Sequence, residues 1–373
     1  MTRIPKNHNR PLQALPCIVL IIVLAFGSLI TVMAQSGRTL SYNRVNQIPL
    51  PGSGGHGDWV TYDSANGYVY LGHHGSDIIV IDTANNSIIA DINGVPEPNG
   101  IAYDSNYLYA SSAAGNFIAV ITKTNWTITG NVKTNGTTPD GIWYSQRYGR
   151  VYVASDDANH VESYTAGPDP KLLNIYPLLP VNPKSGPDVG VLVDSKNTLY
   201  VPDDNLVLSL DLTSGQITNQ LSTNLTVGVE GATKNMIYDN VTNRLWVATT
   251  NNQTWVLNAD TLKPIEVLPA TFPDDQMAFD PTMRLIYAFG GTGFDVYDAN
   301  TPQHLIFVDT SSPITHTGTV DTANHEVYAY EGQANVVGVY ALTVATSEPS
   351  STLAFGLLTL MIVFAAVRSR RKH

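Results

Sequence analysis

The sequence predicts an all-β fold, a seven-bladed β-propeller whose last blade is closed by an N-terminal strand. Three observations lead to it. One unit of short strands and turns recurs seven times, the unit is close to 41 residues long, and residues 41–48 form an extra strand before the first unit. A period of about 40–45 residues with four strands per unit is typical of propellers. No long stretch carries the apolar period of a helix.

The clearest unit is Asp274–Asp298. Its first strand, Met277–Phe279, follows an acidic turn, its second, Leu285–Phe289, follows an Asp-Pro turn, and a third ends at Asp298. The residues that close the first strand of each unit are Asp63, Asp104, Ser145, Asp194, Asp239, Asp280 and Asp321, separated by 41, 41, 49, 45, 41 and 41 residues. Each second strand carries an aromatic residue in the same place: Tyr70, Tyr109, Tyr152, Tyr200, Trp246, Tyr287 and Tyr328.

The ring formed by these units has to close, because one sheet cannot bury both of its faces alone. The seventh unit stops after Val336–Leu342 without a fourth strand. We therefore expect residues 41–48 to supply the outer strand of the last blade.

The strands Val69–Leu71, Val151–Ala154 and Leu199–Val201, with the downstream run Val80–Thr83, resemble those of YVTN-type seven-bladed propellers. This group is also described as surface-layer or lactonase-like propellers, and the resemblance covers residues 41–342. It implies the same fold. The family is functionally mixed, so the resemblance names no activity.

Charge is distributed unevenly along the chain. Residues 35–346 contain 13 basic and 30 acidic residues, a net charge of −17, whereas the two ends are basic. A surface of this sign repels phosphate backbones and disfavours nucleic-acid binding. The only cysteine is Cys17, which excludes an internal disulfide, a zinc site built from cysteines and covalent haem attachment.

Residues 1–34 read as a signal peptide. A basic start precedes a mostly apolar run, and Val32-Met33-Ala34 provides small residues at the positions read by signal peptidase. The alternative is that this long apolar run is retained as a membrane anchor. The globular domain then spans residues 35–346.

Residues 347–373 read as a sorting or anchor segment. Ser347-Glu348-Pro349-Ser350 precedes the apolar run Leu353–Val367 and an Arg-rich tip. This order resembles the PEP-CTERM sorting signal, with Ser347 in place of the first proline. The resemblance implies recognition by a sorting transpeptidase, and the alternative is a plain membrane anchor through the tail. Either way we expect the propeller to face outside the cell.

Candidate site residues lie five positions before each strand-closing residue, where they should face the mouth of the central channel. In order they are Asp58, Asn99, Asp140, Val189, Lys234, Asp275 and His316, with His56, Asp188, Glu230 and Asp274 close to them in sequence. The turns after the second strands should open on the same face and add His73, His74, Asp156, Asp157, His160, Asp203, Asp204 and Glu331.

Carboxylates that converge on one axis repel each other unless something compensates. Lys234 could neutralise one of them and ordered water could spread the remaining charge, but a bound cation would compensate it better. Asp58, Asp140 and Asp275 therefore predict a site for Ca²⁺ or another divalent cation. The histidines at 56, 73, 74 and 316 are the residues that a transition metal would use. The alternative is structural, because Asp and Asn before a strand commonly accept hydrogen bonds from backbone N–H groups in turns.

No phosphate-binding glycine loop, nucleophile elbow or zinc-protease motif is present in the sequence. We therefore expect a surface-exposed binding module for an extracellular protein, glycan or small molecule. The alternative is a lactonase-like or other hydrolase that uses the channel mouth, with or without a metal.

Overall fold

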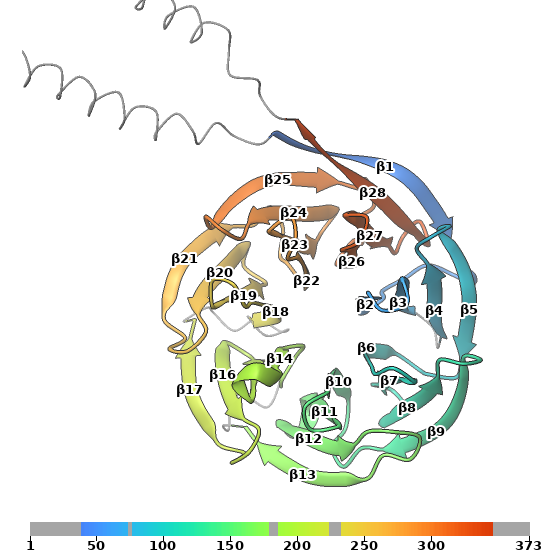
Figure 1. Cartoon of the computed structure of the whole chain (residues 1–373), viewed down its shortest axis with the longest axis vertical. Helices are drawn as coiled ribbons and strands as arrows, with labels where there is room; N and C mark the ends of the chain where they lie inside the picture. Colours follow the sequence, from blue (N-terminus) through green and yellow to red (C-terminus); the bar gives the residue numbers. More distant parts are fainter. Residues whose placement is uncertain (1–38, 74–76, 179–185, 224–232, 346–373) are drawn as a thin grey trace, which may run out of the picture. The chain divides into compact units, whose positions relative to one another are not determined.

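The computed structural model describes residues 39–73, 77–178, 186–223 and 233–345. The chain divides into two units, Tyr42–Leu342 and the two flanking ends, and of the ends only the extremities of two strands are described. The unit Tyr42–Leu342 consists of seven four-stranded sheets arranged around one axis (Figure 1). The prediction of a seven-bladed, all-β propeller is confirmed.

Within each sheet the strands follow one another from the axis outwards. The innermost strands are β2 (Trp59–Asp63), β6 (Pro98–Tyr103), β10 (Pro139–Ser145), β14 (Val191–Val193), β18 (Thr233–Asp239), β22 (Gln276–Asp280) and β26 (Thr317–Asp321). The second strands are β3 (Tyr68–His73), β7 (Tyr107–Ser112), β11 (Arg150–Ser155), β15 (Thr198–Asp203), β19 (Arg244–Thr249), β23 (Leu285–Gly290) and β27 (Glu326–Glu331).

The third strands are β4 (Asp77–Asp82), β8 (Phe117–Thr122), β12 (His160–Thr165), β16 (Leu206–Asp211), β20 (Gln253–Asn258), β24 (Gly293–Asp298) and β28 (Val336–Ala345). The outer strands are β5 (Ser87–Asn93), β9 (Thr127–Lys133), β13 (Leu172–Pro177), β17 (Ile217–Ser222), β21 (Pro264–Pro269), β25 (Gln303–Asp309) and β1 (Thr39–Pro49). Two short 3₁₀ turns, Asp156–Ala158 and Asp194–Lys196, lie between strands.

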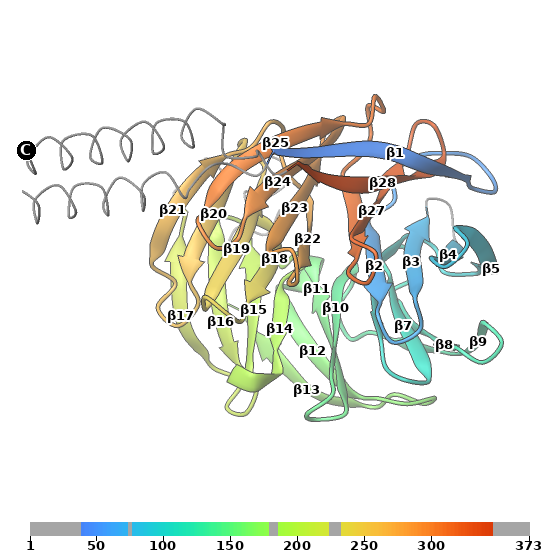
Figure 2. The same cartoon turned by 45° about the horizontal axis from the view of Figure 1, so that its top comes forward.

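The N-terminal strand β1 completes the last blade, as the sequence predicts. The sheet order is β1-β28-β27-β26, and β1 runs along the outside of β28 (Figure 2). Arg44 on β1 forms an ion pair with Glu331, whose side chain is 3% exposed, and its guanidinium lies over the ring of Tyr340.

The core lies between neighbouring blades. All seven aromatic residues predicted on the second strands are at most 2% exposed. Tyr70 of the first blade, for example, packs against Ile101 and Leu108 of the second. Each sheet therefore buries both faces only because a blade stands on either side of it.

The residues that close the innermost strands tie the blades together. Asp239 is fully buried and pairs with Arg284 of the next blade, and His325 of the seventh blade contacts Asp280 of the sixth at 2.6 Å. Ser145 has no carboxylate of its own, and it donates to Asp194, the equivalent residue of the next blade. These residues also accept hydrogen bonds from the backbone of the following turn, as Asp280 does from Thr282 at 2.9 Å.

No helix among the described residues is long and apolar enough to cross a membrane. The segments predicted as signal peptide, residues 1–34, and as sorting tail, residues 347–373, lie outside those residues.

Deletion of residues 41–48 is expected to open the ring. The deletion removes the outer strand of the last blade and the Arg44–Glu331 pair, and it exposes the edge of β28. We expect aggregation in size-exclusion chromatography, or a loss of cooperative melting followed by circular dichroism. Val45→Ser is the control, because Val45 is 55% exposed and exposed substitutions usually change stability by less than about 0.5 kcal/mol. An unchanged melting curve for the deletion would show that β1 does not close the ring.

Arg284→Ala is expected to destabilise the propeller strongly, because it leaves the buried Asp239 carboxylate without its cation. Breaking a buried pair in this way costs roughly 3–5 kcal/mol in chemical denaturation. The control is Lys171→Ala, which removes a pair whose side chains are 67% and 73% exposed and should change stability by less than about 0.5 kcal/mol. Equal effects of the two substitutions would contradict this account of how the blades are joined.

Candidate functional site

The predicted channel-mouth residues converge in the structure. Six of the seven equivalent positions line a single cavity of about 160 Å³, together with residues adjacent to them. Its lining consists of Asp58, Trp59, Asn99, Asp140, Asp188, Val189, Lys234, Asn235, Asp275 and Gln276. The seventh position, His316, lies beside the cavity, 3.8 Å from Asp58. We call this cavity the charged mouth.

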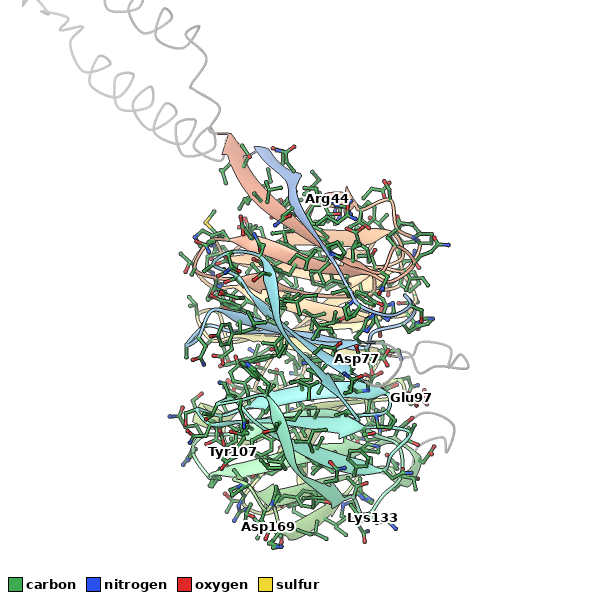
Figure 3. All side chains as sticks on the ribbon, turned by 90° about the vertical axis from the view of Figure 1, so that its right-hand side faces the viewer. Arg44, Asp77, Glu97, Tyr107, Lys133 and Asp169 are labelled. Carbon is green, nitrogen blue, oxygen red and sulfur yellow. The ribbon has the colours of Figure 1, made fainter. Side chains whose placement is uncertain are left out.

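The two faces of the ring can be followed edge-on in Figure 3. Glu97 lies in the loop between β5 and β6, two residues before Asn99 of β6, and it is found toward the face of the charged mouth. Tyr107, the first residue of β7, lies toward the opposite face. The innermost strands run from the first face to the second. Residues at the start of these strands therefore belong to the mouth, and residues at their ends belong to the other face.

Backbone irregularities position several of the side chains. The registers of β6, β10 and β18 with their neighbours shift between Pro98 and Gly100, between Pro139 and Ile142, and between Thr233 and Met236. Asn99, Asp140 and Lys234 lie within these three interruptions. Bulges of this kind bend a strand and re-aim a side chain, and they are common beside functional sites.

Two polar contacts are formed across the mouth. The Lys234 ammonium lies 3.0 Å from the Asp188 carboxylate. The Asn99 carboxamide, oriented with its nitrogen toward the first blade, donates to Asp58 Oδ2 at 3.0 Å and to the Glu97 carbonyl at 3.2 Å. Lys234 and Asp188 thus connect the fifth and fourth blades, and Asn99 and Asp58 connect the second and first.

The carboxyl groups of Asp140 and Asp275 are crowded by like charge. Burial raises the pKa of Asp140 well above its ordinary value, and the nearby Asp188 and Asp58 raise it further. Burial also raises the pKa of Asp275, although Lys234 and His316 act in the opposite direction. Among the described residues, no side chain or backbone group donates a hydrogen bond to either carboxyl group.

The neighbouring carboxylates also raise the pKa values of the two basic groups, Lys234 and His316. The carboxylate of Asp188 raises the pKa of Lys234 above its ordinary value, so Lys234 is charged at neutral pH. Desolvation pulls the pKa of His316 down, but hydrogen bonding to Asp58 and the charge of Asp275 raise it overall above its ordinary value. The His56 ring lies 5.0 Å from that of His316. The mouth thus holds four carboxyl groups against one ammonium and one imidazole.

The acids of the mouth do not form a preassembled metal shell. No group of three His, Cys, Asp or Glu side chains that could hold a metal ion is found in the described part of the chain. Binding of Ca²⁺ or another divalent cation by Asp58, Asp140 and Asp275 would require these side chains to move, and it stays a prediction.

The candidates in the turns after the second strands do not line the mouth. His73 is 1% exposed and contacts Asp77 at 3.0 Å and Asn335 at 2.8 Å, in the seam between the first and last blades. Glu331 binds Arg44, and His160 binds the buried Glu162. His74 and Glu230 lie outside the described residues.

Asp203, another candidate in these turns, has a carboxyl group without a hydrogen-bond partner among the described residues and without contact with solvent. It is fully buried, both of its oxygens lack a hydrogen-bond partner within the described residues, and burial with the nearby Asp204 raises its pKa to about 7. It is not part of the mouth lining.

In the fourth blade the polar residue of the mouth, Asp188, lies one residue before the position that the sequence count gives. The count gives Val189 in the fourth blade. Val189 borders the mouth, but its side chain packs into the core between the third and fourth blades, and the adjacent Asp188 supplies the polar group. The innermost strand of this blade, Val191–Val193, is short. The apolar character of Val189 next to an aspartate was the signal that could have shown it.

Asp140→Asn is expected to stabilise the protein at neutral pH. A raised carboxyl pKa means that the folded state binds more protons than the unfolded state between the two pKa values, so stability falls as pH rises through that window. The substitution removes this loss, and each pKa unit corresponds to about 1.4 kcal/mol. Melting temperatures measured from pH 3.5 to pH 8 should favour the variant at high pH and converge near pH 3.5. A variant that is less stable at every pH would contradict it.

Comparison with known proteins identifies the fold and no closer relationship. No family model matches the chain, and no curated protein matches it. Among solved structures, the chain is similar to the β-propeller domain of Cps50 (Swd1) from Myceliophteria thermophila, with a TM-score of 0.67 and 11% identity over 81% of this chain and 100% of that one. It is also similar to hydrazine synthase from Kuenenia stuttgartiensis, with a TM-score of 0.64 and 15% identity over 80% and 96% of the two chains. The WD40 propeller domain of Doa1 gives a TM-score of 0.66 and 10% identity over 83% and 98%. At these identities the similarity establishes the β-propeller fold alone, and a fold does not name an activity.

Proposed function

We propose that the protein is an exported, surface-retained binding module that takes up a cationic group of an extracellular ligand in the charged mouth. The observation that carries this proposal is the composition of one cavity. Asp58, Asp140, Asp188 and Asp275 share about 160 Å³ with a single ammonium, that of Lys234.

The charges in the mouth favour a ligand group that is positively charged. Lys234 already pairs with Asp188, so it neutralises one carboxylate and leaves the others. Burial and the nearby carboxylates raise the pKa of Asp140, and burial raises that of Asp275, so both charged carboxylates are disfavoured in the empty mouth. A cation in the mouth favours the charged form of both groups, and its binding should therefore strengthen as pH rises.

Size and geometry restrict what enters. A cavity of about 160 Å³ admits an ammonium or guanidinium group with a short stem, and not a whole large ligand. Such groups are carried by lysine and arginine side chains, chain amino termini, amino sugars and small amines. An extracellular protein, a glycan or a small molecule can each present one. The net charge of −17 over residues 35–346 disfavours a nucleic acid as partner.

Export and surface retention are supported by the two ends of the sequence. Residues 1–34 carry the pattern of a signal peptide, and residues 347–373 carry an apolar run with a basic tip. In this proposal the tail is held by the membrane or is processed by a sorting transpeptidase, so the propeller is presented outside the cell.

A hydrolase is the second candidate, and one observation favours it. Two carboxyl groups with raised pKa values lie in one mouth beside further carboxylates, and such a set can divide the roles of general acid and general base. The mouth offers only one ammonium to the anionic groups of a sugar-acid lactone, so the binding function is the one that we favour.

The proposal predicts saturable binding of small organic cations to the full-length chain in detergent. Isothermal titration with cadaverine and propylguanidine should give affinities that rise with pH, while the neutral analogue butanol should give none. Ca²⁺ and Zn²⁺ are titrated in parallel to test the divalent-cation prediction. The double variant Asp140→Asn, Asp275→Asn should bind the organic cations at least about tenfold more weakly, a difference of about 1.4 kcal/mol.

The matched control is Asp169→Asn, because Asp169 is 73% exposed and does not line the mouth. It should leave affinity unchanged. Equal binding by wild type and the double variant would place the cations elsewhere and contradict the proposal. Turnover of lactones or esters that disappears in the double variant would replace it with the hydrolase.

A further inference from the structure

The channel contains a second cavity, whose chemistry is opposite to that of the charged mouth. It has a volume of about 560 Å³ and is lined by residues from the innermost strands of all seven blades. None of the residues that line it is Asp, Glu, Lys, Arg or His. We call this cavity the lumen.

The lumen is separated from the mouth by three side chains that border both cavities, Trp59, Asn235 and Gln276. The Asn235 carboxamide accepts from the Met277 amide at 2.9 Å and donates to the Val189 carbonyl at 3.0 Å. The Gln276 carboxamide bridges blades in the same way. It accepts from Val60 N at 3.1 Å and donates to Val60 O at 2.7 Å. Both carboxamides are hydrogen-bonded to backbone groups. The floor of the lumen, formed by Trp59, Asn235 and Gln276, therefore presents few free side-chain polar atoms to the cavity.

Tryptophan rings form part of the wall near this floor. The indole N–H of Trp59 donates to the Ile101 carbonyl at 3.1 Å, and that of Trp143 donates to the Gly190 carbonyl at 3.0 Å. With their only donors used, both rings contribute apolar surface.

Aromatic rings also surround the far end of the lumen. They occupy the position just before the strand-closing residue in five blades: Tyr62, Tyr103, Tyr144, Tyr238 and Phe279. All five are partly exposed. Two hydroxyls are used by neighbouring groups, since Tyr103 donates to the Tyr62 carbonyl at 2.7 Å and Tyr238 donates to Asn243 at 3.2 Å. This end lies four residues from the mouth along each strand, about 13 Å at 3.3 Å per residue.

We propose that the lumen is a second binding site, for an uncharged, predominantly apolar small molecule with a flat ring. The volume falls in the range of roughly 300–1,000 Å³ found for pockets that enclose small ligands. The side chains of the wall are mainly aliphatic and aromatic, so apolar contact is the main interaction that they offer to a ligand. A charged ligand would lose its hydration without a counter-charge, and a sugar would find few side-chain partners apart from serine and threonine hydroxyls.

This inference does not depend on the charged mouth, because the lumen shares none of the mouth's charged residues. The two sites can therefore fail separately. A ligand of the lumen enters from the aromatic end, on the face opposite to the mouth.

The experiment titrates the full-length chain in detergent with the uncharged fluorescent probe N-phenyl-1-naphthylamine, with empty micelles subtracted. Wild type should show a saturable rise in fluorescence at micromolar probe concentrations. Ile237→Lys places a charge on the lumen wall and should weaken binding at least about tenfold. The control Ile265→Lys makes the same change on the outer strand β21, where Ile265 is 45% exposed, and should leave binding unchanged.

A second variant, Val191→Phe, fills part of the lumen without adding charge and should also weaken binding. Circular dichroism and cooperative melting establish that each variant is folded. The mouth variant Asp140→Asn, Asp275→Asn should bind the probe as wild type does. Absence of saturable binding to wild type overturns the proposal, as does equal binding by the wild type, Val191→Phe and Ile237→Lys.

Discussion

The structure depends on the need to give a partner to the buried carboxylates at the points where innermost strands turn back. Asp63, Asp239 and Asp280 are almost completely buried there, and each finds a basic side chain on the following blade, in Lys123, Arg284 and His325. Desolvating a charge without a partner is costly, so the position of one blade is fixed by the charge of its neighbour. The same carboxylates bind the turn backbone, which joins local hairpin geometry to the spacing of the ring.

This coupling explains why so much of the fold could be predicted from the sequence. A residue that serves both the turn and the neighbouring blade must recur at the blade period, and the recurrence from Asp63 to Asp321 gave the number of blades. Ser145 fits the rule because it donates to Asp194 and shares that carboxylate. Residues 41–48 could be assigned because the seventh unit lacked a strand, and β1 is found in that place.

The site could be predicted only in outline. Counting along the strands brought Asp58, Asn99, Asp140, Lys234, Asp275 and His316 to one end of the channel, because equivalent positions in a ring share an axis. The count could not anticipate that Asp188, next to the counted position Val189, would supply the polar group of the fourth blade, since strand length depends on packing. It also could not predict that Asn235 and Gln276 divide the channel, because their partners come from other blades. One end of the channel is consequently polar and crowded, and the other is aromatic and uncharged.

The pairing of β1 with β28, the last strand of the domain, also determines when the last blade can form during folding. The Asn335 side chain donates to the Leu50 carbonyl at 3.2 Å across a sequence separation of 285 residues. During synthesis the first strand of the domain therefore appears long before its partner, and it cannot join its sheet until six blades have emerged. Contacts of such long range are formed late and slowly. The unpaired segment is short and carries Arg44 among polar residues, a composition that lowers its tendency to pair wrongly during this delay.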